Sequence, residues 1–398
     1  MTRRPGTYLI VIALLAGACK SSEAPTPTAP ARDAGPADAA VADAAIDASG
    51  VWPPLAALPI VDAVRVIALP SRPDVPRFDV GGPAIVDDVA VVSSSQLGFA
   101  AVDWRRGHVV WTKPAGLHVA PPLAHAGAAV LISDCLSPPA LRDTLLGCVR
   151  VVAATGADLS YTAIHGAHLD AFAREPGPQQ LWPDGEHAVR WRRGDQAVSV
   201  DLVTGVARRA AIAPPPVRVE YRGRAWDIAR TDERIVARER GKLAWQTQYP
   251  YTSLLGAVRL PELTPTIRVA RIAPFAGVSE LRLLDIDATG SLHAQTGFPV
   301  PALSILGHAL DAVGNTALAL RMDASLRRDF LVGFAADLAI LYAYPLPEVP
   351  RADPVGVAVA PDGVLVFHDG DVFTVLPALS SAPTAPGIPH LPSQNPTP

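Results

Sequence analysis

The sequence lacks the short motifs that mark common nucleotide-binding, hydrolytic and thiol-redox sites. It has no glycine-rich phosphate loop, no Gly-x-Ser-x-Gly turn and no Cys-x-x-Cys pair. Cysteine is scarce, with 3 residues in 398, and aromatic residues make up only 6% of the chain. Helical periodicity nowhere exceeds a couple of turns. These absences argue against an enzyme of a familiar motif class and against a helical fold.

An excess of positive charge is also missing. The chain has 34 Lys and Arg residues against 38 Asp and Glu, which gives a formal net charge of −4. Removal of an N-terminal signal containing Arg3 and Arg4 would lower it by a further two charges, to about −6. Nucleic-acid binding draws most of its affinity from contacts of Lys and Arg with phosphates. We therefore expect no nucleic-acid partner.

The N-terminus predicts export and a lipid anchor. Arg3 and Arg4 precede an apolar run at residues 9–15, which is too short to span a bilayer but fits the apolar region of a secretory signal. Residues 16–19 read AGAC and resemble the bacterial lipoprotein signal, although Ala16 stands where that family usually has Leu. The resemblance implies cleavage after residue 18, acylation of Cys19 and attachment to a membrane of the cell envelope. The alternative is an ordinary signal peptide with an incidental cysteine.

Two segments have compositions that cannot form a core. After the signal peptide (1–18), residues 19–52 are rich in Ala, Pro and Asp, and residues 380–398 are rich in Pro. Such segments bury too little apolar surface to offset the entropy of ordering them. We predict a disordered tether at 19–52, a disordered tail at 380–398 and a folded domain at 53–379.

The pattern within 53–379 is typical of an all-β fold. The chain contains 41 Pro and 30 Gly, and short runs rich in Val, Ile and Leu recur between turn residues, as at 84–92, 128–133 and 363–367. Short apolar runs bounded by Gly, Pro, Asp and Ser predict strands joined by tight turns. A β-sandwich, a two-domain β protein and a repeat protein are all compatible with this pattern alone.

A repeat of turn glycines separates these alternatives. The glycines are Gly107, Gly156, Gly205, Gly241 and Gly290, with spacings of 49, 49, 36 and 49 residues. A weaker copy has Asp337 in place of the glycine. A period in the forties with about four strands per unit predicts a β-propeller. The length suggests about seven four-stranded blades, and the strand-like run at 64–69 is expected to close the ring by completing the last blade.

The most complete copy of the turn contains Asp103, Gly107 and Trp111. The partial copies are Asp201 with Gly205, Gly241 with Trp245, Gly156, and Gly290. This pattern resembles the pyrroloquinoline-quinone-type repeat, in which Asp, two spacers and Thr-Gly precede an apolar strand that ends in Trp. The resemblance implies that Trp111 and Trp245 pack between neighbouring blades and have a structural role.

The resemblance does not extend to the cofactor of quinoprotein dehydrogenases. Cys135 and Cys148 are thirteen residues apart, so there is no adjacent-cysteine pair, and no acidic and amide set aligns with the calcium site. His165 and His168 lack a third ligand nearby and are expected to be a solvated pair. We expect no catalytic residues, no cofactor and no metal.

The sequence therefore favours a non-catalytic, membrane-anchored scaffold that binds an envelope protein, a small ligand or a polysaccharide. In this it resembles the scaffold members of the repeat family, which include an outer-membrane assembly lipoprotein propeller. The alternative is an enzyme, either a degenerate quinoprotein or a carbohydrate-active propeller, with its active site at the mouth of the channel.

Cys135 and Cys148 are the two thiols left once Cys19 is acylated. Cys135 follows one predicted strand and Cys148 is expected to begin the next. In an oxidising compartment such a pair tends to be joined. We predict a disulfide across the base of a loop, 136–147, that extends from the second blade.

Overall fold

The computed structural model describes the chain in segments: residues 60–72, 74–75, 80–136, 145–169, 171–172, 175, 179–214, 216–231, 234–248, 252–258, 266–275, 278–299, 302–311, 313–322, 329–346 and 355–379. The chain divides into two units, residues 1–51 and 52–398, and every described residue lies in the second. The predicted signal peptide, Cys19, the tether at 19–52 and the tail at 380–398 all lie outside the described residues.

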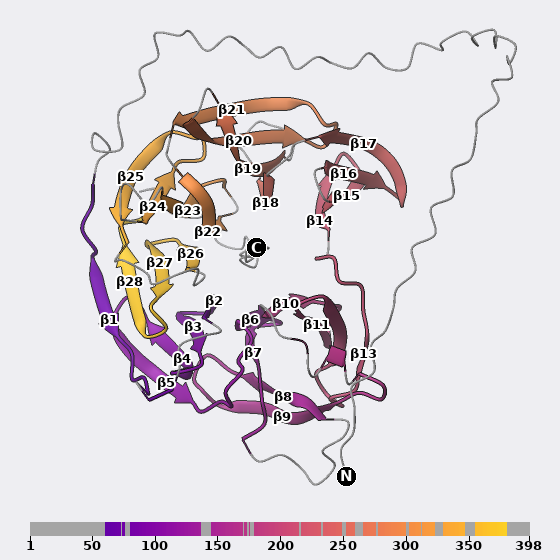
Figure 1. Cartoon of the computed structure of the whole chain (residues 1–398), viewed down its shortest axis with the longest axis vertical. Coiled ribbons are helices and arrows are strands. Elements are labelled where there is room, and N and C mark those ends of the chain that lie inside the picture. The colour runs from indigo at the N-terminus through magenta and orange to yellow at the C-terminus, as the bar shows by residue number, and fades with distance from the viewer. Residues whose placement is uncertain are drawn as a thin grey trace, which may run out of the picture. The chain divides into compact units, whose positions relative to one another are not determined.

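The described part of the second unit is built from seven antiparallel sheets of four strands each (Figure 1). Blade 1 consists of β2 (Gly81–Val86), β3 (Val89–Ser94), β4 (Gly98–Asp103) and β5 (His108–Lys113). Blade 2 consists of β6 (Leu123–His125), β7 (Ala128–Ser133), β8 (Leu145–Val152) and β9 (Asp158–His165). Blade 3 consists of β10 (Gln179–Pro183), β11 (Ala188–Arg193), β12 (Gln196–Asp201) and β13 (Ala207–Arg209).

The remaining blades repeat the same order. Blade 4 consists of β14 (Val217–Tyr221), β15 (Arg224–Thr231), β16 (Arg234–Glu239) and β17 (Lys242–Gln248). Blade 5 consists of β18 (Thr252–Val258), β19 (Thr266–Phe275), β20 (Val278–Asp287) and β21 (Leu292–Pro299). Blade 6 consists of β22 (Ala302–Leu310), β23 (Thr316–Met322), β24 (Phe330–Phe334) and β25 (Ile340–Pro345). Blade 7 consists of β26 (Gly356–Ala360), β27 (Gly363–His368), β28 (Val372–Leu376) and β1 (Arg65–Ala68).

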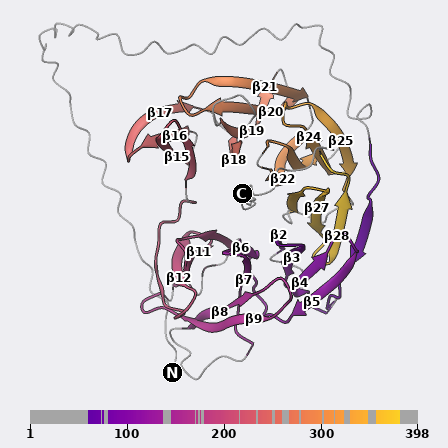
Figure 2. The same cartoon turned by 180° about the vertical axis from the view of Figure 1, so that it is seen from behind.

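The first strand of the chain completes the last blade. β1 pairs antiparallel with β28, so that Arg65 lies opposite Val375 and Ala68 opposite Val372. The two strands lie side by side in both face-on views (Figures 1 and 2). The prediction of a propeller with about seven four-stranded blades, closed by an N-terminal strand, is confirmed, and the blade number is seven.

The core lies between the blades rather than at one centre. Six hydrophobic clusters join blades 1 and 2, 2 and 3, 4 and 5, 5 and 6, 6 and 7, and 7 and 1. Each cluster exists because strand side chains alternate between the two faces of a sheet, and an apolar face of one blade meets an apolar face of the next. Among the described residues, no such cluster joins blade 3 to blade 4.

The reason is the alternation of apolar and charged side chains along strands of blades 3 and 4. We call the junction between these two blades the seam. On β11, Val189 and Trp191 belong to the cluster shared with blade 2, and Arg190 and Arg192 alternate with them. On β14, Val217 and Val219 are buried toward blade 5, and they flank the exposed Arg218. Each blade therefore turns its apolar face away from the seam and a charged face toward it.

One local expectation was wrong. Cys148 was expected to begin a strand, but β8 starts at Leu145 and Cys148 is its fourth residue, opposite Ser133 of β7. The strand starts earlier because Leu145 and Gly147 pair with His165 and Ile164 of β9.

Candidate functional site

The repeated glycines occupy equivalent turns. Each lies between the third and fourth strands of its blade, from blade 1 to blade 5. The five turn glycines, Gly107, Gly156, Gly205, Gly241 and Gly290, have φ angles of 75, 89, 71, 78 and 89°. This left-handed region is open to glycine without steric penalty. In blade 6, where the sequence has Asp337, the neighbouring Leu338 takes the positive φ of 71°.

The two tryptophans of the repeat contact the next blade. The indole Nε1 of Trp111 donates a hydrogen bond to the carbonyl of Ala154 at 3.0 Å, and a Cβ added to Gly156 would lie 2.6 Å from the Trp111 ring. The indole of Trp245 donates to Ala288 at 2.8 Å and covers Gly290 in the same way. Each tryptophan thus seals the turn of the following blade.

The repeat aspartates hold the turns themselves. Asp103 accepts a hydrogen bond from the backbone N–H of Arg106 at 2.9 Å. Asp201 accepts from the backbone N–H and the hydroxyl of Thr204, at 2.7 and 2.9 Å. These hydrogen bonds lower the pKa of Asp201 below its usual value, and the bond from the Thr204 backbone N–H has the largest effect. These residues of the repeat therefore hold turns and pack between blades.

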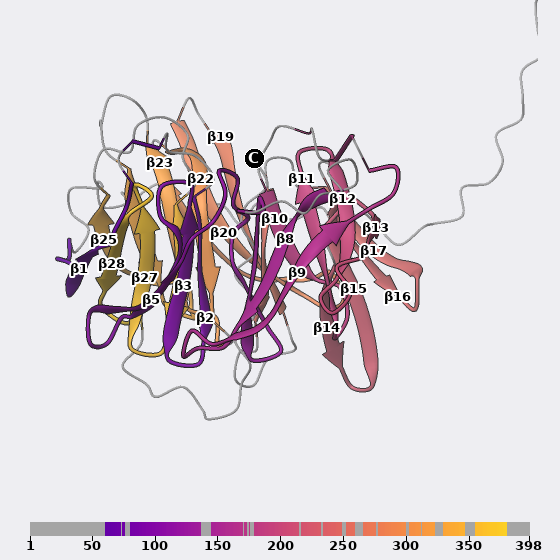
Figure 3. The same cartoon turned by 90° about the horizontal axis from the view of Figure 1, so that it is seen from below.

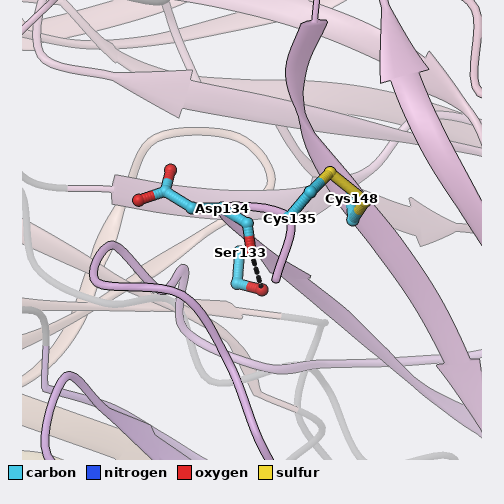
Figure 4. The surroundings of a disulfide bond; sticks show 4 residues. All are labelled: Ser133, Asp134, Cys135 and Cys148. Carbon is cyan, nitrogen blue, oxygen red and sulfur yellow. Dashed lines mark hydrogen bonds between the residues drawn. A yellow bond between two sulfur atoms is a disulfide. The ribbon is translucent and has the colours of Figure 1, made fainter. Parts of the chain in front are cut away.

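The disulfide marks a surface on blade 2. Cys135 and Cys148 are joined with an S–S distance of 2.05 Å and a Cα–Cα distance of 5.1 Å (Figure 4). Next to it, the hydroxyl of Ser133 donates a hydrogen bond to the carbonyl of Asp134 at 3.0 Å. The bridge ties the chain that leaves β7 to the middle of β8. Most of the predicted loop, residues 137–144, lies outside the described residues.

A second set of bonds fixes the neighbouring segment to the disulfide. The backbone N–H of Asp134 donates to the carbonyl of His118 at 3.0 Å, and a carboxylate oxygen of Asp134 accepts from the backbone N–H of His118 at 3.1 Å. The backbone at Val119 also forms an antiparallel bridge with Ser133. The chain around Leu117 is therefore held against the disulfide by its backbone.

Three large side chains on this frame are exposed to solvent. Leu117 is 55% exposed, Leu136 is 50% exposed and Tyr161 is 51% exposed. The Arg150 guanidinium lies over the Tyr161 ring, 4.8 Å from its centroid, and pairs with Asp158 at 3.6 Å. We call Leu117, Leu136, Arg150, Asp158 and Tyr161, together with the disulfide, the disulfide surface. A small recess in it is lined by Pro114, Leu136, Cys148, Arg150 and Tyr161, among others.

The composition and the rigidity of this surface bear on what it could bind. Apolar and aromatic side chains held on a rigid frame, with a charged rim, are typical of the centre of a protein interface. Rigid presentation reduces the entropy lost on binding. The signal in the sequence was the cysteine pair, but the exposure of Leu117 and Tyr161 depends on packing that no local pattern reveals.

A second hollow, of about 540 Å³, lies on blades 2 and 3 beside the segment that holds the two histidines singled out in the sequence. His165 lines it with Arg208 and Arg209, and an Arg209 guanidinium hydrogen donates to the carbonyl of His168 at 3.4 Å. Within the described residues, no group of three His, Cys, Asp or Glu side chains could hold a metal ion. Besides His165, the polar side chains of the hollow's lining are those of Arg208 and Arg209.

Neither a protein-family model nor a curated protein matches the sequence. Among solved structures, the chain is similar to BamB from Moraxella catarrhalis, with 13% identity and a TM-score of 0.37 over 79% of this chain and 96% of that one. It is similar to the Cps50 (Swd1) β-propeller domain of Myceliophteria thermophila, with 11% identity and a TM-score of 0.46 over 78% and 99%. A chain of the Mitotic Checkpoint Complex gives 8% identity and a TM-score of 0.48 over 82% and 97%.

Likeness at this level concerns the fold alone, so the assignment rests on the strand pairing of this chain. By that pairing the folded unit is a seven-bladed β-propeller. In the part of the chain that the structure describes, no helix is long and apolar enough to span a membrane.

Proposed function

We propose that this protein is a lipid-anchored, non-catalytic β-propeller of the bacterial cell envelope that binds a partner protein through the disulfide surface. The binding role is carried by one observation. Leu117, Leu136 and Tyr161 are exposed apolar side chains on a frame held by a disulfide and by backbone hydrogen bonds. Exposed apolar side chains that lie together on a surface mark interaction sites.

The anchor rests on the N-terminal sequence. An apolar run at 9–15 follows two arginines, and AGAC at 16–19 supplies small residues before Cys19. Acylation of Cys19 would attach the propeller through the Ala-, Pro- and Asp-rich segment at 19–52. The cysteine pair supports export independently, because disulfides form and persist in oxidising compartments.

The anchor is tested by labelling. Cells expressing the protein are grown with radiolabelled palmitate, and Cys19→Ser is compared with the unchanged chain. We expect label and membrane fractionation in the unchanged chain and neither in the variant. Label that persists in Cys19→Ser would refute acylation at this position.

The binding role is tested by site-specific photo-cross-linking in intact cells. A photoreactive residue is placed at Leu117, Leu136 or Tyr161, and at Val203 of blade 3 as the control because Val203 is 70% exposed. One discrete protein adduct common to the three positions and absent at Val203 is expected. Absence of an adduct at all three positions, or an equal yield at Val203, would remove the disulfide surface as the binding site.

A further inference from the structure

The turn at Gly241 in blade 4 differs from its four equivalents. A Cβ added to Gly107, Gly156, Gly205 or Gly290 would collide with the outer strand of the preceding blade, whereas at Gly241 it would meet nothing within 4 Å. The reason lies in blade 3, whose outer strand β13 is only three residues long and carries no equivalent of Trp111. The turn of blade 4 is therefore uncovered, and its side chains are open to solvent.

This uncovered turn lies beside a second turn of the same kind. The hairpins β14–β15 and β16–β17 end at the same edge of blade 4, because Trp226 lies opposite Glu239 and the Arg224 side chain pairs with that of Glu239. Both turns have an Arg-Gly pair at positive φ, with Arg222 at 50° and Arg240 at 49°. Figure 3 shows β14 and β15 running side by side toward this edge.

The two turns gather cations with little compensation. Arg222, Arg224, Arg240 and Lys242 are all exposed, and the acid among them is Glu239. Arg224 is paired with Glu239. Within the described part of the chain, the other three cations have no ion pair. We call these four cations, together with Leu243, the cationic tip.

The charge distribution of the whole chain points to the same region. Residues 179–248, which contain blades 3 and 4, hold 13 of the 34 Lys and Arg residues but only 9 of the 38 Asp and Glu. This segment has a net charge of +4, and the rest of the chain has −8. Such a separation of charge orients the positive part of a protein toward an anionic surface.

The cationic tip also has apolar groups beside its charges. Leu243 follows Lys242 and is 55% exposed. The guanidinium of Arg222 lies 5.0 Å from the centroid of Tyr221, and that of Arg224 lies 4.9 Å from the centroid of Trp226. Cations with apolar stems, next to an exposed leucine, match the interface between lipid headgroups and acyl chains. A protein partner would require a broader apolar centre than this tip provides.

We propose that the cationic tip of blade 4 binds the anionic phospholipid headgroups of a membrane and so sets the orientation of the propeller on it. That this membrane is the one to which the acylated Cys19 is attached rests on the proposed function. The attraction itself depends only on the folded propeller. Attachment through a tether does not by itself fix the orientation of the propeller, whereas an additional electrostatic contact holds one face toward the lipid.

The test uses the mature chain without its lipid, exported behind an ordinary cleavable signal so that it begins at Lys20. Sedimentation with phosphatidylcholine vesicles is compared with sedimentation with vesicles that also contain phosphatidylglycerol. The tip variant is Arg222→Asn, Arg240→Asn and Lys242→Gln, in which asparagine tolerates the left-handed backbone of both turns. The control variant is Arg106→Gln, Arg208→Gln and Arg209→Gln, which removes the same charge outside the cationic tip. Because Arg208 and Arg209 lie in the same positive segment, it separates the tip from the overall charge of that segment.

We expect binding to the phosphatidylglycerol vesicles at about 50 mM salt and its loss at about 500 mM, because salt screens exposed charges. The tip variant should bind roughly 100-fold more weakly, since each cation near an anionic surface contributes about a factor of five. The control should stay within about threefold of the unchanged chain.

Two outcomes would overturn the proposal. One is equal binding to both kinds of vesicle or equal binding by the tip variant. The other is binding to polyglutamate but not to phosphatidylglycerol, which would assign the tip to an acidic protein. Neither outcome bears on the acylation of Cys19, because the chain used carries no lipid, and palmitate labelling separates the two questions.

Discussion

Gly156 and Gly241 have nearly the same backbone but different neighbours, which makes them a matched pair. Gly156 has φ of 89° and lies under the Trp111 ring, whereas Gly241 has φ of 78° and nothing close. We expect Gly241→Ala to destabilise by about 1–2 kcal/mol, the backbone cost of a side chain at positive φ. Gly156→Ala should cost about 1–3 kcal/mol more, because the methyl group overpacks against Trp111. Chemical denaturation measures both, and equal effects would show that the tryptophan contact is unimportant.

His308 on β22 is buried, and neither of its ring nitrogens has a hydrogen-bond partner among the described residues. Burial lowers its pKa to about 4, against about 6.5 in an unfolded chain. The unfolded state therefore binds the extra proton between these two values, and stability falls as the pH is lowered from 6.5 toward 4. We expect a loss on the order of 2 kcal/mol between pH 7 and pH 5 from this residue.

His308→Leu should flatten this part of the pH profile, since it removes the titrating group and a desolvated polar ring. Thermal unfolding across pH 5–7 measures the effect. His187→Gln is the control, because it removes a histidine whose side chain is 72% exposed. A steep slope that survives in His308→Leu would place the acid sensitivity elsewhere.

At the scale of elements, the disulfide joins the end of β7 to β8 over a sequence separation of 13 residues. A closed loop of this size stabilises by roughly 3 kcal/mol through the entropy of the unfolded chain. Replacing Cys135 and Cys148 by serine should lower the melting temperature by several degrees without opening the propeller, because the clusters on both faces of blade 2 remain. Calorimetry measures the shift, and mass spectrometry of unreduced tryptic peptides from exported protein identifies the bridge. Free thiols at both positions would contradict it.

The turns were predictable from the sequence because positive φ is a local requirement. Gly107 to Gly290 could be aligned for that reason, whereas in blade 6 the positive φ at Leu338 left no glycine to find. The buried pair of Arg268 and Asp285 left no signal either. Its two nitrogen–oxygen contacts are 2.7 Å long, and Arg268 also reaches the carbonyl of Ala336 in blade 6. Such a pair depends on how two blades meet, which periodicity does not encode.

For the candidate site, the sequence pointed to Cys135 and Cys148 but not to the surface around them. Leu117 is exposed beside the segment that Asp134 holds, and Tyr161 lies on the outer strand β9 of blade 2, so neither exposure follows from a local pattern. The cations of the two blade 4 turns are not a cluster in the sequence, because they come together only when two hairpin ends lie at the same edge of the sheet. Local chemistry was therefore readable, and surfaces assembled from distant residues were not.

At the scale of the whole propeller, the strand pairing that closes the ring and the junction that lacks an apolar cluster lie between different blades. The ring is closed by the pairing of β1 with β28, and the cluster between blades 7 and 1 covers this joint. The seam between blades 3 and 4 has no corresponding cluster among the described residues. Blade 4 therefore buries an apolar face toward blade 5 only, whereas blade 1 buries one on each side.

This difference predicts that the ring loosens at the seam and not at the closing strand. Burying each large apolar side chain contributes about 1.5–3 kcal/mol, so a blade packed on one face opens locally at a much lower free energy. Native-state hydrogen exchange should show amides of β15 and β16 in blade 4 exchanging at least about 100-fold faster than those of β3 and β4 in blade 1. These strands are a fair comparison because each is hydrogen-bonded on both sides. If amides of β1 and β28 exchange first instead, the closing pair is the weak point and the seam is held by contacts other than apolar packing.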